Sequence, residues 1–394
     1  MAPGALIGAY QEDDSGGLRA LLPLAGRTLL EYQVRCASSV GAAPIVVVVE
    51  RVPQALQDAF ERLRLDGIGV FPVSDVLEAV SRFEAGSMIL VIGDGIVPPT
   101  ELVAQLAEEA EPVVTTVPDD DAHEAYERID AEVRWAGVAL VEASLLGSTA
   151  AMLGDWDLQS TLLRRTIQNG ALRVPVSEGE GEPLLVNHPD QLQDFQRMMI
   201  ASSRGARTDW VSRYLLPPLE DLATEQLMDS NIRPAWMVWT ALVLTVGAAL
   251  AFLQGWPVLA LVFLLVSAPL DIIAARLASL RMRPLPTRMA ARTALWPAAG
   301  VAALALGWWD ARHVSSWGAF TAAACAVAFA EAYRIERGAL PVPGQVWLVS
   351  RRGAIFAAIP FAIFGAWTAY LVALLVYAGL SFFYAQHARH LRSS

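Results

Sequence analysis

The sequence predicts an α/β domain with a mainly parallel sheet, followed by an all-α membrane domain of six helices. Over residues 1–205, apolar runs typical of buried strands alternate with amphipathic stretches typical of helices. Beyond residue 233 lie six apolar stretches, most of which approach the about 20 residues that a helix needs to cross a bilayer. Charge divides in the same way, with 17 Arg and 36 acidic residues in 1–233 but 12 Arg and 4 acidic residues in 234–394.

The first domain is expected to begin with a strand and to alternate regularly after it. Continuous apolar runs indicate strands that are buried on both faces. Amphipathic stretches between them indicate covering helices. We therefore expect strands at 4–9, 44–50, 87–95 and 112–117, and helices at 27–42, 52–67 and 99–110.

The second half is expected to contain six membrane spans. A long apolar run is broken at Gly365, which indicates a tight hairpin between the last two spans. We expect the domain boundaries to give a cytoplasmic domain (1–205), an amphipathic juxtamembrane linker (206–233) and a membrane domain (234–394). The expected spans are 235–254, 257–275, 290–309, 314–332, 352–366 and 367–386.

The basic residues of the loops predict the orientation. Cytoplasmic loops collect arginine, and the loops on the opposite side carry only Arg312. The chain is therefore expected to be a multi-pass protein of the inner (cytoplasmic) membrane with both termini in the cytoplasm. The arginines that set this orientation are Arg276, Arg281, Arg283, Arg288, Arg334, Arg337, Arg351, Arg352, Arg389 and Arg392.

Several classes of function find no support. Cys36 and Cys325 lie in different halves, so neither a disulfide nor a zinc site is indicated. The histidines show no ligand spacing. No basic, aromatic-rich face indicates nucleic acid as a partner. Because the chain contains no lysine, a charged side chain that contacts phosphate is expected to be an arginine.

One acid, Asp271, lies in the second predicted span, and Arg276 follows it. Acids within spans are costly and face a polar cavity or a partner. Two interpretations stay open: an ion pair at the membrane interface, or the remnant of a site. The separation of five residues is not an ideal helical pair, which weakens the first interpretation.

The stretch 268–276, APLDIIAAR, resembles the pattern D-x-x-D-G-x-x-A-R of the CDP-alcohol phosphatidyltransferases, which have six spans with this motif on the second. In that family four aspartates hold divalent metals, and one of them acts as a base. The resemblance implies a catalytic and metal-binding role for Asp271 and a phosphate-binding role for Arg276. Ala268 and Ile272 depart from the pattern, and no acid follows between 276 and 309. Transfer chemistry is therefore expected to be impaired.

The stretches 18–49 and 90–99, the latter reading LVIGDGIVPP, resemble the GT-A-like nucleotidyltransferases. The resemblance implies that Asp94 binds metal and nucleotide phosphates and that Arg19 binds substrate. Leu185 stands where the family has a second metal-binding aspartate. The glycine-rich first loop of the family is replaced by IGAYQEDDSGGL, whose three acids would repel a nucleotide unless a metal intervened.

The order of the two domains resembles the bifunctional inositol-phosphate cytidylyltransferase and phosphoinositol synthase, with degenerate motifs. This resemblance implies an origin in phospholipid or phospho-alcohol head-group synthesis. We expect a catalytically impaired protein that acts as a binding or regulatory subunit, with weakly held Mg²⁺ or Mn²⁺. Its expected partners are membrane lipid, a CDP-alcohol or nucleotide, and a second copy or an intact paralogue. The alternative is an active transferase that moves a phospho-alcohol group from a CDP-alcohol to an alcohol acceptor.

Overall fold

The computed structural model of the chain divides into two compact units, Met1–Met199 and Ile200–Ser394. It describes residues 2–152, 158–176, 181–203, 207–228, 230, 232–283, 285–286, 289–338 and 344–393. Residues 391–393 are described without their side chains. The expected boundary after residue 205 falls outside the described residues, as do Arg288 and the side chain of Arg392. The division 1–205, 206–233 and 234–394 therefore stays a prediction.

The first unit is built on a seven-stranded sheet in the order β10-β8-β9-β6-β1-β4-β5. Strand β9 is antiparallel to both of its neighbours, β6 and β8, and the remaining pairs are parallel. The predicted α/β fold with a mainly parallel sheet is confirmed. The strands are β1 (Gly4–Gly8), β4 (Ile45–Val48), β5 (Val70–Val73), β6 (Met88–Ile92), β8 (Val113–Pro118), β9 (Val133–Glu142) and β10 (Leu172–Pro175).

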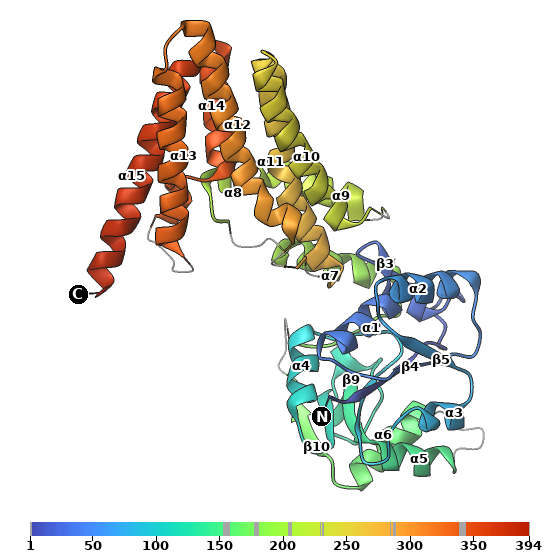
Figure 1. Cartoon of the computed structure of the whole chain (residues 1–394). Helices are drawn as coiled ribbons and strands as arrows, with labels where there is room; N and C mark the ends of the chain where they lie inside the picture. The colour runs from blue at the N-terminus through green and yellow to red at the C-terminus, as the bar shows by residue number, and fades with distance from the viewer. Residues whose placement is uncertain are drawn as a thin grey trace. The chain divides into compact units, whose positions relative to one another are not determined.

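Helices and two small ribbons complete this unit (Figure 1). Thr28 and Glu31 form a capping box at the start of α1, and the fully buried Glu31 also pairs with Arg62 of α2. The helices are η1 (Arg19–Leu21), α1 (Leu29–Ser39), α2 (Gln54–Leu65), α3 (Val76–Ser81), α4 (Thr100–Glu108), η2 (Asp121–His123), α5 (Ala143–Ala150), α6 (Leu158–Gln168) and α7 (Pro189–Ser202). The ribbons pair β2 (Pro23–Leu24) with β3 (Arg27–Thr28), and β7 (Ile96–Val97) with β11 (Leu184–Leu185).

The second unit is helical (Figure 1). Helices α10 and α11 pack together, as do α13 and α15, and α12 packs on both α10 and α13. Gly365 separates α14 from α15 with a positive φ of 66°, so the predicted hairpin forms there. The helices are α8 (Trp210–Tyr214), α9 (Pro217–Met228), α10 (Pro234–Leu253), α11 (Pro257–Leu280), α12 (Ala290–Val314), α13 (Gly318–Arg337), η3 (Gln345–Trp347), α14 (Arg351–Ile363) and α15 (Trp367–Ser393).

Three helices among the described residues are long and apolar enough to cross a membrane, namely Pro234–Leu253, Pro257–Leu280 and Trp367–His390. They indicate membrane association. Helix α14 has only 13 residues, well short of the about 20 that span a bilayer. Helices α12 and α13 are long enough but are not among the three helices that also meet the hydropathy and charge requirements of a span. Six crossings and the cytoplasmic position of both termini therefore stay predictions.

Arg281, one of the arginines in the predicted cytoplasmic loops, closes the end of helix α9. Its side chain is buried and donates hydrogen bonds to the carbonyls of Ile232 and Ser230, both at 2.6 Å. It also reaches Leu227 and Met228 in the last turn of α9. Cations favour helix C-termini, whose carbonyls have no partner within the helix. This arginine therefore contributes to folding as well as to loop charge.

His123, in the first unit, bridges two carboxylates that are far apart in the sequence. Its Nδ1 lies 2.6 Å from Asp120 Oδ1, and its Nε2 lies 2.7 Å from Glu182 Oε1. Burial alone would lower the pKa of His123, but the bonds to Glu182 and Asp120 outweigh it and raise the pKa. The imidazolium form therefore holds the segment that carries Glu182 against η2.

We predict that His123→Gln lowers the free energy of unfolding of the first unit by about 1.5–3 kcal/mol at pH 6, because charged hydrogen bonds are lost. The effect should shrink at higher pH. Because the pKa of His123 is raised in the folded protein, its stabilising contribution is fully present below about pH 6.5, the ordinary pKa of histidine. The contribution is lost as the pH rises through the pKa of the folded protein. The loss of stability is measured by amide hydrogen exchange of residues 181–186 in the full chain, corrected for the intrinsic exchange rates at each pH.

His188→Gln is the matched control, because His188 pairs with Asp14 at an exposed position and such pairs contribute little. Equal losses in the two variants, or an effect of His123→Gln that does not change with pH, would contradict the role of the bridge.

Candidate functional site

The first candidate site lies where strand β6 ends in Gly93-Asp94-Gly95. Ligands of open α/β sheets bind outside the carboxyl ends of the strands. Gly95 has a φ of +74°, and a Cβ there would lie 3.0 Å from Arg19 Cδ and 3.1 Å from Val186 O. Glycine therefore allows three segments, from residues 19, 95 and 186, to meet at one strand end.

Asp94 has one occupied and one unoccupied carboxylate oxygen. Its side chain is only 4 % exposed. Oδ2 accepts the backbone N–H groups of Tyr10 and Gln11, each at 2.7 Å. Oδ1 is buried and has no hydrogen-bond partner among the described residues. Burial raises the pKa of Asp94 to about 6, against the opposing effect of the two N–H groups and of Arg19. The group is thus ionised at neutral pH with one oxygen still able to accept.

The first loop holds Arg19 near this acid. Arg19 Nη1 donates to Gln11 Oε1 at 2.9 Å, and Nε donates to the carbonyl of Glu12 at 3.1 Å. Gln11 also contacts Asp94 through its N–H. The structure therefore brings together Arg19 and Asp94, the two residues singled out by the sequence. Their roles in binding substrate and metal stay predictions.

The segment 184–187 runs beside the same strand end. Leu185 pairs with Ile96, and Val186 N–H donates to Gly95 O at 2.8 Å. Leu185 supplies no oxygen, but the buried Oδ1 of Asn187 has no partner among the described residues. We did not identify Asn187 from the sequence. The sequence feature that could have indicated it is an amide side chain two residues after Leu185, in the stretch LVNHP.

Asp13 organises the first loop from within. Its Oδ1 accepts Ser15 N at 2.9 Å, Ser15 Oγ at 2.7 Å and Gly17 N at 2.8 Å. The hydrogen bond from the Ser15 hydroxyl lowers the pKa of Asp13 most strongly. Two backbone N–H groups of the loop are thereby satisfied by a carboxylate, so they are not free to bind a phosphate.

The other two acids of the loop have basic partners. Glu12 pairs with Arg51 at 2.7 Å, and Asp14 pairs with His188 at 2.8 Å. Both pairs are exposed, so solvent screens them and lets them open readily. The repulsion that three acids would exert on a nucleotide is therefore smaller than the sequence indicated.

The second candidate site surrounds Asp271 in the helical unit. Its Oδ1 lies 2.8 Å from Arg351 Nη2, and its Oδ2 lies 2.6 Å from Arg352 Nη2. Arg352 also binds Asp209 at 2.7 Å. The expected alternative of an ion pair with Arg276 does not form, which agrees with the unfavourable separation of five residues. Asp271 instead joins α11 to the first turn of α14.

Arg276 is buried and its guanidinium is engaged elsewhere. Nη1 binds Asp221 Oδ1 at 2.7 Å, Nε donates to Ser203 Oγ at 3.1 Å, and Nη2 donates to the carbonyl of Ile200 at 2.8 Å. These contacts fasten α9 and the segment 200–203, all within the second unit, to α11. A phosphate contact of Arg276 stays a prediction, and it would have to replace one of these bonds.

The surroundings of Asp271 are basic. A cavity of about 320 Å³ beside it is lined by five arginines and two aspartates, namely Arg292, Arg334, Arg337, Arg351, Arg352, Asp209 and Asp271. Within the described ranges no group of three or more His, Cys, Asp or Glu residues could hold a metal. The arrangement favours binding of an anion at this place.

The comparison with protein families concerns the first unit. Residues 15–208 match the family model of the MobA-like NTP transferase domain. The first unit is a nucleotidyltransferase-like domain. No curated protein matches the chain, and the residues that match the family model end at 208, at the start of the helical unit.

Two solved structures are similar to this chain. The inositol-1-phosphate CTP transferase from T. maritima is 14 % identical, with a TM-score of 0.41, over 52 % of this chain and 98 % of that one. A protein from Bacillus anthracis, assigned as a glucose-1-phosphate thymidylyltransferase and solved in complex with a sucrose, is 10 % identical, with a TM-score of 0.38, over 50 % of this chain and 94 % of that one.

We predict that Asp271→Ala destabilises the helical unit by about 3 kcal/mol, because it leaves two largely buried arginines without their carboxylate. Thermal unfolding of the purified full chain in neutral detergent measures the loss. Glu336→Ala, which breaks an exposed pair with Arg389, should change stability by less than about 1 kcal/mol. Equal stability of Asp271→Ala and the unmodified chain would contradict the bridge.

Proposed function

We propose that the chain is a membrane protein with a nucleotide-binding first domain and a helical domain that descends from CDP-alcohol phosphatidyltransferases but no longer transfers phospho-alcohol groups by itself. The observation that carries this proposal is the double ion pair of Asp271. Both of its oxygens contact arginines, so neither is available to a divalent cation unless the pairs open.

Metal-dependent transfer requires a different environment from the one around Asp271. Divalent cations held a few ångströms apart need several anionic oxygens. Here Ala268 and Ile272 stand at two motif positions, and arginines surround the remaining acid. Positive charge at this place would repel a metal ion. The residues present therefore do not fit the metals that the resemblance implies.

The first domain fits a metal-bound nucleotide better. Asp94 Oδ1 and Asn187 Oδ1 are buried oxygens without partners among the described residues, and oxygen is the ligand that Mg²⁺ and Mn²⁺ prefer. A bound cation would neutralise phosphate charge there. Asp94 would hold the cation, with Asn187 beside the same strand end, and Arg19 would contact the phosphate or the substrate. Because Leu185 contributes no carboxylate, we propose that the cation is held weakly.

We propose that the protein serves phospholipid or phospho-alcohol head-group synthesis as a binding or regulatory subunit at the cytoplasmic membrane. A second copy or an intact paralogue would supply the missing transfer activity. Three apolar helices of sufficient length support a position in the membrane. In the first loop, Asp13 accepts the backbone N–H groups of Ser15 and Gly17, which are then not free to bind a phosphate. This supports weak nucleotidyl transfer by the first domain.

The transfer prediction uses the intact purified chain. With CDP-alcohol donors, alcohol acceptors and Mg²⁺ or Mn²⁺, we expect no transfer above a protein-free blank, because no metal pair forms at Asp271. With CTP and phospho-alcohols, we expect little release of pyrophosphate. Transfer that is abolished by Asp271→Ala in folded protein would overturn the proposal and establish the alternative of an active transferase.

The nucleotide prediction concerns Asp94. We expect Asp94→Asn to weaken binding of Mg²⁺–CTP at least about tenfold while the first loop stays folded, because the amide oxygen still accepts from Tyr10 and Gln11. In the unmodified chain, binding should weaken as pH falls below about 6, where Asp94 becomes protonated.

Isothermal titration of the full chain measures this binding. Asp58→Asn, at an exposed site on α2, is the control and should bind as the unmodified chain does. Unchanged affinity in Asp94→Asn would exclude this acid as the metal ligand.

A further inference from the structure

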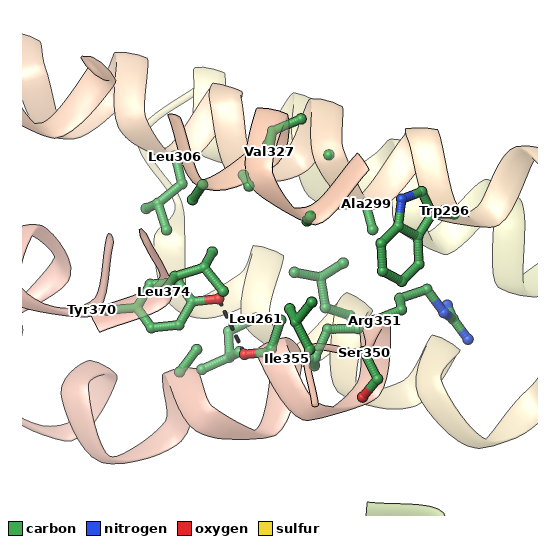
Figure 2. A pocket seen from close by; sticks show the side chains of 18 of the residues that line it. Leu261, Trp296, Ala299, Leu306, Val327, Ser350, Arg351, Ile355, Tyr370 and Leu374 are labelled. Atoms are coloured by element: carbon green, nitrogen blue, oxygen red, sulfur yellow. Dashed lines mark hydrogen bonds between the residues drawn. The ribbon is translucent and has the colours of Figure 1, made fainter. Parts of the chain in front are cut away.

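An apolar cavity of about 90 Å³ lies inside the helical unit, between α11, α12, α13, α14 and α15. Figure 2 shows Tyr370 and Leu374 at one end of it, and Trp296, Ser350 and Arg351 at the other. Small residues such as Ala299 line the wall between these ends. A water molecule needs about 10–15 Å³ of such space, so the cavity holds roughly six to nine groups of that size. This suits one short alkyl chain.

The apolar cavity adjoins the arginine-lined cavity of about 320 Å³ beside Asp271. The two share four lining residues, Trp296, Val349, Ser350 and Arg351. A ligand could therefore lie in both at once. Its hydrocarbon part would pack against alanine and leucine side chains, and its polar end would meet guanidinium groups.

The arginine-lined cavity carries positive charge beyond what its ion pairs with described acids neutralise. Asp209 and Asp271 balance two of its five arginines, and Glu331, which bonds to Arg334, balances a third. Arg292 and Arg337 make no ion pair with any described residue. Two positive charges therefore remain, which matches the charge of one phosphate monoester.

Arg351 points to where the anion would bind. Its side chain is only 8 % exposed. Nη2 binds Asp271, but Nη1 is buried and has no partner among the described residues. A buried donor without an acceptor costs free energy, and an anionic oxygen at the junction of the two cavities would satisfy it. The same is true of the buried Nε of Arg337.

We propose that the helical unit binds an anionic amphiphile with one alkyl chain, the chain in the apolar cavity and a phosphate group between Arg351 and Arg337. No metal takes part. The proposal goes beyond the function proposed above, because it requires neither nucleotide binding nor loss of transfer activity. The ligand class is defined by an alkyl chain joined to a phosphate, and free phosphate is the competing source of the same charge.

The test uses native mass spectrometry of the full chain, purified in a neutral sugar detergent without nucleotide or divalent metal. Octyl phosphate carries both features, octyl glucoside only the chain, and inorganic phosphate only the charge. We expect a single saturable site for octyl phosphate, with affinity at least about tenfold above that for inorganic phosphate. Octyl glucoside should not displace it at equal concentration.

Variants assign the two parts of the site. Arg337→Gln should weaken octyl phosphate at least about tenfold, because a charged hydrogen bond is lost. It breaks no ion pair with a described residue, so the fold should persist, whereas Arg351→Gln also disturbs Asp271 and needs a check of thermal stability. Ala299→Leu, which shortens the apolar cavity, should weaken octyl phosphate but leave inorganic phosphate unchanged.

Arg389→Gln is the matched charge control, because Arg389 belongs to an exposed pair with Glu336 and lines neither cavity. It should bind octyl phosphate as the unmodified chain does. Equal weakening by Arg389→Gln and Arg337→Gln would show that only overall charge matters, which overturns the proposal. Equal affinity for octyl phosphate and inorganic phosphate would show that the alkyl chain does not contribute to binding, which also overturns the proposal.

Discussion

The arrangement of the helical unit depends on the ion pairs of Asp271, because charged side chains on apolar helices must find partners. Acids and arginines within or beside membrane spans are costly unless they find partners. Asp271 of α11 meets Arg351 and Arg352 of α14, and Arg352 continues to Asp209 at the start of α8. One network of four charges thereby fixes three helices. The same pairing occupies both oxygens of the acid and sets Arg351 beside two cavities.

The first unit shows the opposite outcome at its own strand end. Asp94 is buried, yet its ligands are backbone N–H groups rather than arginine side chains. One oxygen is therefore left able to meet a cation. The two units thus differ in what they can bind: an acid poised for a cation in one, and guanidinium groups with unused donors in the other. The nucleotide site proposed for the first unit and the anion site proposed for the second therefore need no shared reaction.

The regular elements could be predicted well from the sequence. Strands β1, β4, β6 and β8 follow from continuous apolar runs, and α1, α2 and α4 follow from amphipathic periodicity. Strand β9, the long strand that runs antiparallel to both of its neighbours, was not predicted. Its direction is set by how the chain returns to the sheet, which its own stretch VRWAGVALVE does not encode. Helix α14 is also shorter than the expected span 352–366, since it already ends at Ile363.

The sequence by itself determined the two-part architecture and the strand-end position of Asp94. These follow from local patterns, whose physical causes act over a few residues. Only the tertiary structure decided the partners of the charged groups. Asp271 pairs with Arg351 across 80 positions, and Asn187 reaches the strand end through a backbone bond from Val186 to Gly95. Such pairings depend on how helices and strands pack, and packing joins residues whose separation along the chain carries no signal of their contact.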